Sequence, residues 1–234
     1  MAYDVNRDEA PARPDAAAGR AWASSFLGHF PGKVQDELRG SALPMTIAPG
    51  HIIYRAHEHP RLVLVASGLA RVVTSSPDGR KATIRYARAG DCVGTVSVVT
   101  DWQEVMAEAV TPAHVLFLNV DRLRSLARSE PEVGWLLAQA VGNVCTEVIE
   151  MMSATVFGSV RQRLARHLLD LAIRRDGELV VLQDQQEMAD AVGSVREVVG
   201  RTLRDLRDRG LVSHAGAGLR LIDPDGIHEL SLEG

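Results

Sequence analysis

The chain has 234 residues and is 46% apolar, which suffices for the buried cores of two modest domains. Its formal net charge of −4 argues weakly against a protein that coats nucleic acid over its whole surface, although specific binding depends on where the charge lies. Two isolated cysteines, Cys92 and Cys145, argue against a disulfide framework and against an iron–sulfur cluster held by several cysteines.

The amino terminus has no cationic start followed by an apolar run, and no apolar stretch in the chain approaches roughly 18 residues. We therefore expect a cytoplasmic protein that is neither secreted nor inserted in a membrane. Residues 1–20 are rich in Ala, Pro, Asp and Arg, a composition that favours a disordered tail. We assign this tail no function.

From Pro44 to about Val120, short β-prone runs alternate with turn residues. The runs read MTIAPG, HIIYRA, RLVLVASG, LARVVTSSPDG, RKATIRYARAGD, VGTVSVVT and HVLFLNV. Glycines fall where the chain must turn, at Gly50, Gly68, Gly79 and Gly90. Many short strands at this spacing predict an all-β barrel or sandwich.

Several histidines lie in this region, at His51, His57, His59 and His114. Imidazoles can hold haem or zinc, but no further residues complete a ligand set here. The pair His57 and His59 lies in a predicted surface loop before Pro60. We therefore expect solvated or structural histidines and no metal site, with haem sensing as an alternative. Cys92 is expected to be a small buried cysteine rather than a redox sensor.

After Pro131, a long helical pattern carries apolar residues at alternating intervals of four and three. These residues are Leu137, Val141, Val144, Val148, Met151 and Thr155. This spacing is the seam of a two-stranded coiled coil, so we predict a dimerisation helix over residues 131–157. The alternative is a core helix inside one subunit. A dimer would let two identical heads recognise a palindrome.

Residues 185–211 predict a helix, a tight turn and a second helix. Asp184 can accept from the amides that open the first helix and Glu187 can reach back, which is the spacing of a capping box. Ser194 and Glu197 repeat this spacing at the start of the second helix.

The second helix is predicted to have an apolar face and a charged face. The apolar face consists of Val195, Val199, Leu203 and Leu206. The other face carries Arg196, Glu197, Gly200, Arg201, Arg204 and Asp208. Arginine can donate twice to guanine and glutamate can accept from cytosine, so this face suits a G·C-containing half-site, with Gly200 allowing close approach. The alternative is a solvated helix with an ordinary Glu197–Arg201 ion pair.

A short β-hairpin is predicted directly after the second helix. Leu211 and Val212 precede the turn-like HAGAG from His214 to Gly218, and residues 219–222 follow it. The hairpin completes a winged helix-turn-helix, a layout typical of proteins that bind double-stranded DNA.

This segment resembles the DNA-binding domain of the Crp/Fnr transcription regulators, whose R-E-x-x-G-R spacing is met by Arg196, Glu197, Gly200 and Arg201. The resemblance implies that Arg196, Glu197 and Arg201 read bases, with a preference for a TGTGA-like half-site. We add Ser194 and Arg204 as DNA-binding candidates. The family usually has Ser or Thr before the first arginine, where this chain has Val195.

The amino-terminal half is similar to the cyclic-nucleotide-binding β-roll, a jelly roll, of the same family. The pieces APG, ASGLARV and RAGD come in the family's order, and the resemblance covers roughly Ser25 to Leu230. It implies an α+β fold with a sensor β-roll at 21–130, a dimerisation helix at 131–157 and a winged helix-turn-helix at 158–234.

The resemblance aligns the family's effector pocket with Gly94, Thr95, Gln103, Glu104, Val148 and Ile149. In members that bind cyclic AMP, a G-E pair accepts from the ribose and an R-S or R-T pair holds the phosphate. Here the first glutamate is Thr95, the arginine is Gln103, and Glu104 would repel a phosphate. Val148 and Ile149 offer the adenine no hydrogen bond. We therefore expect an effector other than canonically bound cyclic AMP, of unknown identity.

The whole pattern predicts a transcription regulator and no enzyme, since G-x-S-x-G, H-E-x-x-H and phosphate-loop motifs are missing from the sequence. The expected partners are double-stranded DNA, a second copy of the chain, RNA polymerase and a small-molecule effector. The alternatives are a gas or redox sensor whose haem or other small ligand is primary, and a constitutive, ligand-independent DNA binder.

Overall fold

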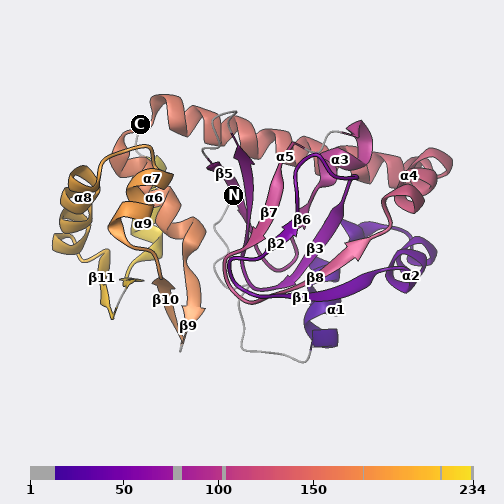
Figure 1. Ribbon diagram of the computed structural model, residues 1–234, viewed down its shortest axis with the longest axis horizontal. Coiled ribbons are helices and arrows are strands. Elements are labelled where there is room, and N and C mark those ends of the chain that lie inside the picture. Colours follow the sequence, from indigo (N-terminus) through magenta and orange to yellow (C-terminus); the bar gives the residue numbers. More distant parts are fainter. Residues whose placement is uncertain (1–13, 76–80, 102–103, 176, 217, 233–234) are drawn as a thin grey trace. The chain divides into compact units, whose positions relative to one another are not determined.

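The computed structural model describes residues 14–75, 81–101, 104–175, 177–216 and 218–232. The chain divides into two compact units, the first ending at Val148 and the second beginning at Ile149 (Figure 1). Among the described residues, no helix combines the length and hydropathy needed to cross a lipid bilayer.

The first unit opens with helix α1 (Pro14–Ser24), the short 3-10 helix η2 (Phe26–His29) and helix α2 (Gly32–Gly40). Trp22 of α1 is buried, and its indole N–H donates to the Gln35 side chain at 3.0 Å. The prediction of a disordered tail to residue 20 is therefore wrong from Pro14 onward. The Ala- and Pro-rich composition suggested disorder, but the buried Trp22 side chain anchors α1 to the rest of the unit.

Two four-stranded antiparallel sheets form the body of the first unit. The first sheet has the order β1-β8-β3-β6, made of β1 (Leu43–Ile47), β8 (Ala113–Leu118), β3 (Leu62–Ser67) and β6 (Cys92–Val93). The second has the order β2-β7-β4-β5, made of β2 (Ile52–Tyr54), β7 (Met106–Ala109), β4 (Ala70–Ser75) and β5 (Lys81–Ala87). The predicted β-roll is confirmed.

Strand β3 of the first sheet is buried on both faces. Val63 and Val65 of β3 share a core with Val72 of the second sheet, while Leu62 and Leu64 join the core beneath the helices. A strand covered on both sides reads as a continuous apolar run, as LVLVA does here.

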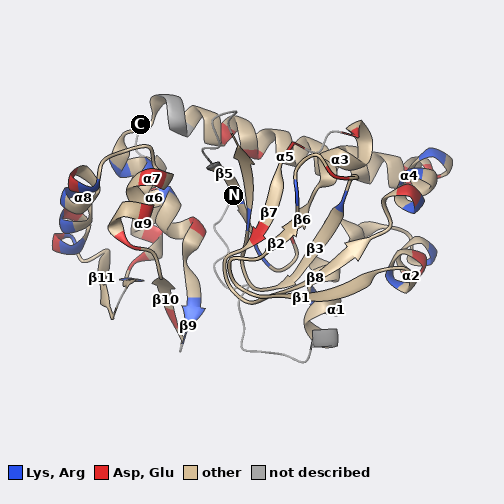
Figure 2. Ribbon diagram, viewed as in Figure 1, with Lys and Arg blue, Asp and Glu red and all other residues tan. Residues whose placement is uncertain are grey.

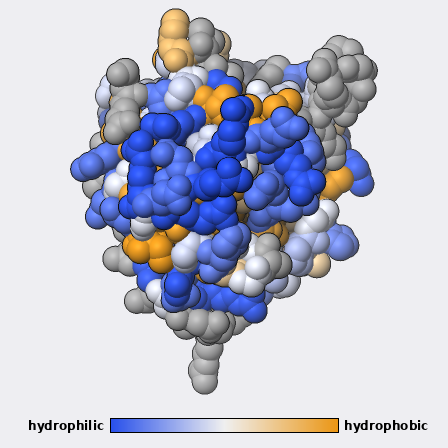
Figure 3. Space-filling view, turned by 90° about the vertical axis from the view of Figure 1, so that its left-hand side faces the viewer, coloured by the Kyte–Doolittle hydropathy of each residue, from blue (hydrophilic) through white to orange (hydrophobic). Residues whose placement is uncertain are grey.

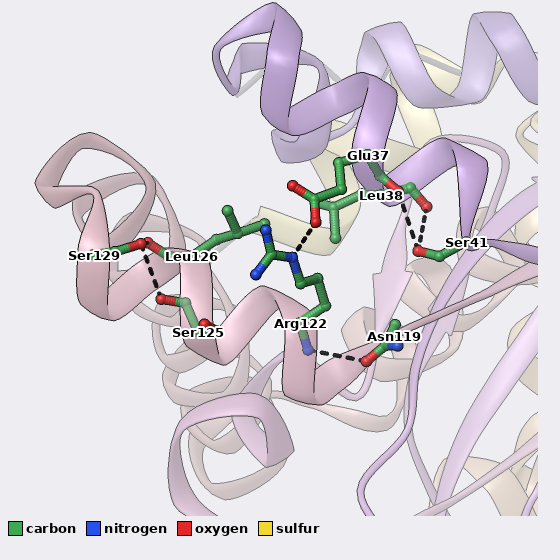
Figure 4. Close-up of polar contacts among 8 residues, drawn as sticks. All are labelled: Glu37, Leu38, Ser41, Asn119, Arg122, Ser125, Leu126 and Ser129. Atoms are coloured by element: carbon green, nitrogen blue, oxygen red, sulfur yellow. Dashed lines mark hydrogen bonds and ion pairs between the residues drawn. The ribbon is translucent and has the colours of Figure 1, made fainter.

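Helices α3 (Thr95–Thr100) and α4 (Val120–Ser129) pack on each other in this unit. The side chain of Asn119 caps α4 by accepting from the Arg122 amide at 2.9 Å. The Arg122 side chain pairs with Glu37 of α2, and this hydrogen bond lowers the pKa of Glu37 (Figure 4). The pair joins α2 to α4 at the surface.

The run VGTVSVVT was predicted to be a strand and is mostly helix α3. Its β-branched residues favour a strand, but Gly94 adopts a left-handed backbone with φ +88°. A Cβ at this position would lie 1.8 Å from the Arg61 carbonyl oxygen, so the close approach fixes the turn. Strand β7 was not predicted, because MAEA has no β-branched residue. Gly50, Gly68 and Gly90 also have positive φ, and Gly79 lies outside the described residues.

The predicted long helix is confirmed as α5 (Pro131–Phe157). The second unit then contains α6 (Val160–Leu171), α7 (Gln185–Ala191), α8 (Arg196–Asp208) and α9 (Pro224–Leu232). Its sheet has the order β11-β12-β10-β9, made of β11 (Val212–Ala215), β12 (Gly218–Leu221), β10 (Glu178–Val181) and β9 (Ile173–Arg175). The winged helix-turn-helix is confirmed, with β9 and β10 extending the predicted hairpin.

Candidate nucleic-acid interface

The start of α7 is fixed by the predicted capping box. The Asp184 carboxylate accepts from the amides of Gln186 and Glu187 at 2.7 and 2.8 Å. The Glu187 carboxylate accepts in return from the Asp184 amide at 3.0 Å. These bonds satisfy amides that would otherwise lack partners at the helix start.

The turn between α7 and α8 ends differently from the prediction. The Ser194 amide donates to the Ala189 carbonyl oxygen at 2.9 Å, which closes the end of α7. Helix α8 then begins at Arg196, with Val195 as its N-cap and no side-chain cap. The predicted capping role of Ser194 is therefore wrong, since its backbone belongs to the preceding turn. The Glu197 carboxylate is exposed instead of reaching back to a cap.

Arg163 of α6 supports this turn, a role that no sequence motif indicated. Its Nε donates to the Val192 carbonyl oxygen at 2.9 Å, and its Nη1 donates to the Gly158 carbonyl oxygen at 2.6 Å. The guanidinium thus joins the end of α7 to the residue that follows α5.

Three of the four predicted apolar residues of α8 form its buried face. Val199, Leu203 and Leu206 are fully buried, and α8 packs on α6 and α7. Val195 is 61% exposed, so its assignment to this face is wrong. As the N-cap it has an extended backbone and lies outside the helical repeat.

The opposite face of α8 presents charged side chains to solvent. Its exposed residues are Arg196, Glu197, Arg201, Arg204 and Asp208. The alternative Glu197–Arg201 ion pair does not form in the described part of the chain, where Asp205 instead pairs with Arg161 and Arg209, each at 3.3 Å. The arginines of α8 appear as blue bands in Figure 2, on a largely hydrophilic side of the second unit (Figure 3).

Gly200 is half-buried and faces α7 rather than the open charged face. A Cβ at this position would lie 3.3 Å from the Gln185 Oε1 atom. The close approach that Gly200 permits in this structure is to α7 of the same unit, and its contact with DNA stays a prediction.

The predicted effector positions are only partly brought together. Thr95 is buried beside Gly94 at the start of α3, while Glu104 is exposed and its carboxylate lies 3.4 Å from the His57 Nδ1 atom. Gln103 lies outside the described residues. On α5, Val148 is half-buried and Ile149 is exposed.

Sequence reasoning missed Arg85, which lies on β5 and reaches α5. Its side chain donates to the Glu147 carboxylate at 2.8 Å and to the Cys92 carbonyl oxygen at 2.6 Å. The only sequence signal is one arginine placed between Ile84 and Tyr86 in a β-prone run.

The predicted dimer seam on α5 is partly covered within the chain itself. Leu137 is only 3% exposed and belongs to the core of its own unit, so it is not available to a second copy. The next seam residues, from Val141 to Met151, are half-buried, and the side chain of Thr155 lies outside the description. The exposed large apolar residues of α5 are Trp135, Ile149, Met152 and Phe157.

The candidate histidines are engaged separately. The His114 Nδ1 atom lies 3.0 Å from the Thr46 hydroxyl, whereas His57 pairs with Glu104. Within the described ranges, no group of three or more His, Cys, Asp and Glu side chains is placed to hold a metal ion. Burial raises the pKa of the Cys92 thiol far above its ordinary value, which suppresses its thiolate.

Comparison with known proteins agrees with this architecture. Residues 44–130 match the model of the cyclic nucleotide-binding domain, and residues 162–230 match that of the Crp-like helix-turn-helix domain. The transcriptional regulator LdrP of Thermus thermophilus is 33% identical over 182 residues, covering 74% of this chain and 88% of LdrP.

Two further proteins are similar over most of the chain. The CRP-like cAMP-activated global transcriptional regulator of Mycobacterium tuberculosis is 27% identical over 192 residues, covering 79% of this chain and 86% of that protein. A solved structure of a Crp/Fnr-family transcriptional regulator from Eubacterium rectale superposes with a TM-score of 0.70 at 19% identity. It covers 89% of this chain and 98% of that chain, and it supports the fold alone.

Proposed function

The chain belongs to the Crp/Fnr family of DNA-binding transcription regulators, and we propose that it acts as a homodimer reading a TGTGA-like palindrome. The observation that carries this proposal is the exposed face of α8. Arg196, Glu197 and Arg201 point into solvent there without forming ion pairs with one another. They are therefore available to donate to guanine and to accept from cytosine in a major groove.

The neighbouring residues have supporting roles in this proposal. Arg204 lies one turn beyond Gly200 and is exposed, so it can reach the groove or its phosphate edge. Ser194 is half-buried in the turn two residues before Arg196, and we assign its hydroxyl a phosphate contact. Val195 is exposed but has no hydroxyl, so the contact usual at this position in the family is lost.

We place the dimer contact on a stripe of α5 shifted by one residue from the predicted seam. The shifted stripe consists of Trp135, Ala138, Gly142, Cys145, Ile149 and Met152, all exposed. These positions keep the alternating spacing of three and four that a two-stranded coiled coil requires. A second copy would cover Trp135 and Ile149, which are costly to leave in water. A palindrome read by two such α8 helices would have half-sites about 34 Å apart, one turn of the DNA.

The effector is proposed to differ from canonically bound cyclic AMP. Thr95 replaces the ribose acceptor, Glu104 adds negative charge, and no arginine occurs between Arg88 and Arg122. A second candidate, constitutive DNA binding, is favoured by the Arg85–Glu147 ion pair. In this pair the Glu147 carboxylate neutralises the Arg85 guanidinium, so the contact between β5 and α5 forms without a bound anionic ligand.

The test is a fluorescence-anisotropy titration of the full chain with a TGTGA palindrome and with a scrambled duplex of equal composition. We expect at least about a thousandfold preference for the palindrome at fixed salt. Arg196→Gln and Arg201→Gln should each reduce this preference by about 1–3 kcal/mol. Equal affinity for the palindrome and the scrambled duplex would contradict the proposal.

The effector proposal has its own measurement. Adding cyclic AMP at about 1 mM, an excess over typical small-ligand affinities, should leave the affinity for the palindrome unchanged. Mass spectrometry of the protein purified without added ligand distinguishes a tightly held effector from constitutive binding. A cyclic-AMP-dependent rise in affinity would contradict the proposed loss of canonical binding.

A further inference from the structure

A hollow of about 300 Å³ lies beside the charged face of α8 in the second unit. Its walls come from the start of α7, from α8 and from the β11–β12 hairpin. Arg196 and Arg207 line it from α8, Gln185 and Gln186 from α7, and His214 from β11. The hollow therefore joins the proposed base-reading helix to the wing.

The charge of this hollow favours an anion. Arg196 and Arg207 contribute two guanidinium groups, and Asp184 is the one acidic residue among the described lining residues. The Asp184 carboxylate already accepts two amide hydrogen bonds from α7. Its negative charge is thus partly neutralised by the helix start, and the two arginines dominate the local potential.

Arg207 and His214 form a direct contact across the hollow. An Nη1 group of Arg207 in the last turn of α8 hydrogen-bonds to the Nε2 atom of His214 on the wing. This contact orients the guanidinium while leaving its other N–H groups to donate elsewhere, since guanidinium has five donors in a fixed fork. The oriented fork suits the tetrahedral oxygens of a phosphate.

Arg207 lies near the carboxyl-terminal end of α8 and Arg196 at its amino-terminal end, so we expect the two residues to contact different parts of the DNA. Eleven residues of α-helix place the two Cα atoms about 16 Å apart along the axis. In helix-turn-helix proteins, the amino-terminal end of the recognition helix contacts base edges. The carboxyl-terminal end of α8 is therefore suited to the sugar–phosphate backbone that borders the groove.

We infer that Arg207, oriented by His214, binds a backbone phosphate of the DNA and so fixes the register of α8. This inference rests on the DNA-binding role of α8 proposed above. Arg207 would contribute affinity but no discrimination between base pairs, because phosphate contacts carry no direct sequence information. His214 would act as a positioning residue through Arg207.

The test compares Arg207→Gln with Arg209→Gln, which removes the same charge two residues away. Arg209 is exposed and pairs with Asp205, and it does not line the hollow. Arg207→Gln should weaken binding to the palindrome and to random DNA equally, by about fivefold to tenfold at 0.1 M salt. It should also reduce the slope of log affinity against log salt by about one. Arg209→Gln should leave the slope unchanged.

Two further variants separate a phosphate contact from a structural role. Arg207→Lys keeps the charge and should restore most of the slope, whereas His214→Gln should give a smaller loss of affinity at the same urea midpoint of unfolding. An Arg207→Gln effect that Arg209→Gln matches, or one confined to the palindrome, would overturn the inference. If Arg196→Gln lowers the sequence preference while Arg207→Gln changes neither the affinity nor the salt slope, only this inference fails. If neither variant has an effect, the proposed function fails.

Discussion

Arg85 of β5 donates from Nη1 to the Glu147 carboxylate of α5 at 2.8 Å, within one compact unit. The Arg85 side chain is only 18% exposed, while that of Glu147 is 51% exposed. The second Arg85 amino group donates to the Cys92 carbonyl oxygen at 2.6 Å. A guanidinium fixed in this way ties the β-roll to the long helix, and it needs no bound anion for neutralisation.

Removing this tie should loosen α5 from the roll. Arg85→Met removes both hydrogen bonds and should lower the free energy of unfolding of the first unit by about 1–2 kcal/mol. Glu147→Gln should cost less than about 1 kcal/mol, because the carboxylate is half-exposed and screened by solvent. Urea unfolding monitored by tryptophan fluorescence measures both values. Equal costs for the two variants would contradict the asymmetry of the contact.

Gly94 should tolerate no side chain. Its φ of +88° and the Arg61 carbonyl oxygen 1.8 Å from an added Cβ predict that Gly94→Ala lowers the free energy of unfolding by at least about 2 kcal/mol. Gly19→Ala is the matched control, because Gly19 lies in α1 with nothing within 4 Å of an added Cβ. That variant should gain about 0.5–1 kcal/mol from helix propensity. A tolerated Gly94→Ala would contradict the close approach of the two backbone segments.

His167 should make the stability of the second unit depend on pH. Burial lowers the pKa of His167 below 6.5, and its Nε2 atom hydrogen-bonds to the Gln183 side chain at 2.8 Å. Between the lowered pKa and 6.5 the unfolded chain binds a proton that the folded unit does not. The stability from neutral His167 is therefore present above pH 6.5 and is lost as the pH falls toward the lowered pKa.

Unfolding of the protein at about pH 7.5 and about pH 5.5 measures this effect. His167→Gln retains a polar group near Gln183 but does not titrate, so the drop in stability between the two conditions should be smaller than in the wild type. An equal drop in both proteins would assign the pH dependence to other groups.

The sequence predicted those parts of the helix-turn-helix that depend on residues a few positions apart. It was less successful where the structure depends on contacts with the preceding helix. Asp184 and Glu187 lie three residues apart and cap the same helix, so their spacing alone predicted the bonds. Ser194 has the same spacing to Glu197, but its amide is already used by Ala189 of the preceding helix. The two pairs have the same spacing, and only the hydrogen bond formed by the folded turn shows that the second pair does not cap a helix.

Long-range packing explains the errors in the amino-terminal half. The helix α5 was predicted correctly, but its sequence carries two stripes with the same spacing, one through Leu137 and one through Ala138. Only the β-roll, which buries Leu137, determines which stripe faces outward. Gly94 likewise ends a β-prone run through its approach to the distant residue Arg61. The Arg85–Glu147 pair spans 62 positions, a separation at which no local motif operates.

The register of α5 can be tested with a cysteine that the chain already has. Cys145 is exposed on the shifted stripe, and Cys92 is buried with its thiol pKa raised, so only Cys145 should react in the folded protein. In a parallel coiled coil, equivalent seam positions of two copies face each other closely enough for a disulfide. Mild oxidation by copper phenanthroline and oxygen should therefore link Cys145 of two copies, each thiol losing one proton and one electron.

The predicted seam provides the matched control for this cross-link. In a Cys145→Ser background, Val144→Cys places the thiol one residue away on the half-buried stripe, where it is less exposed than at position 145. We expect little covalent dimer from this variant and extensive covalent dimer from the wild type, at a protein concentration where sedimentation shows the same non-covalent dimer for both. Stronger cross-linking at position 144 would restore the seam through Val144 and Val148, whereas an absence of dimer in both would contradict dimerisation through α5.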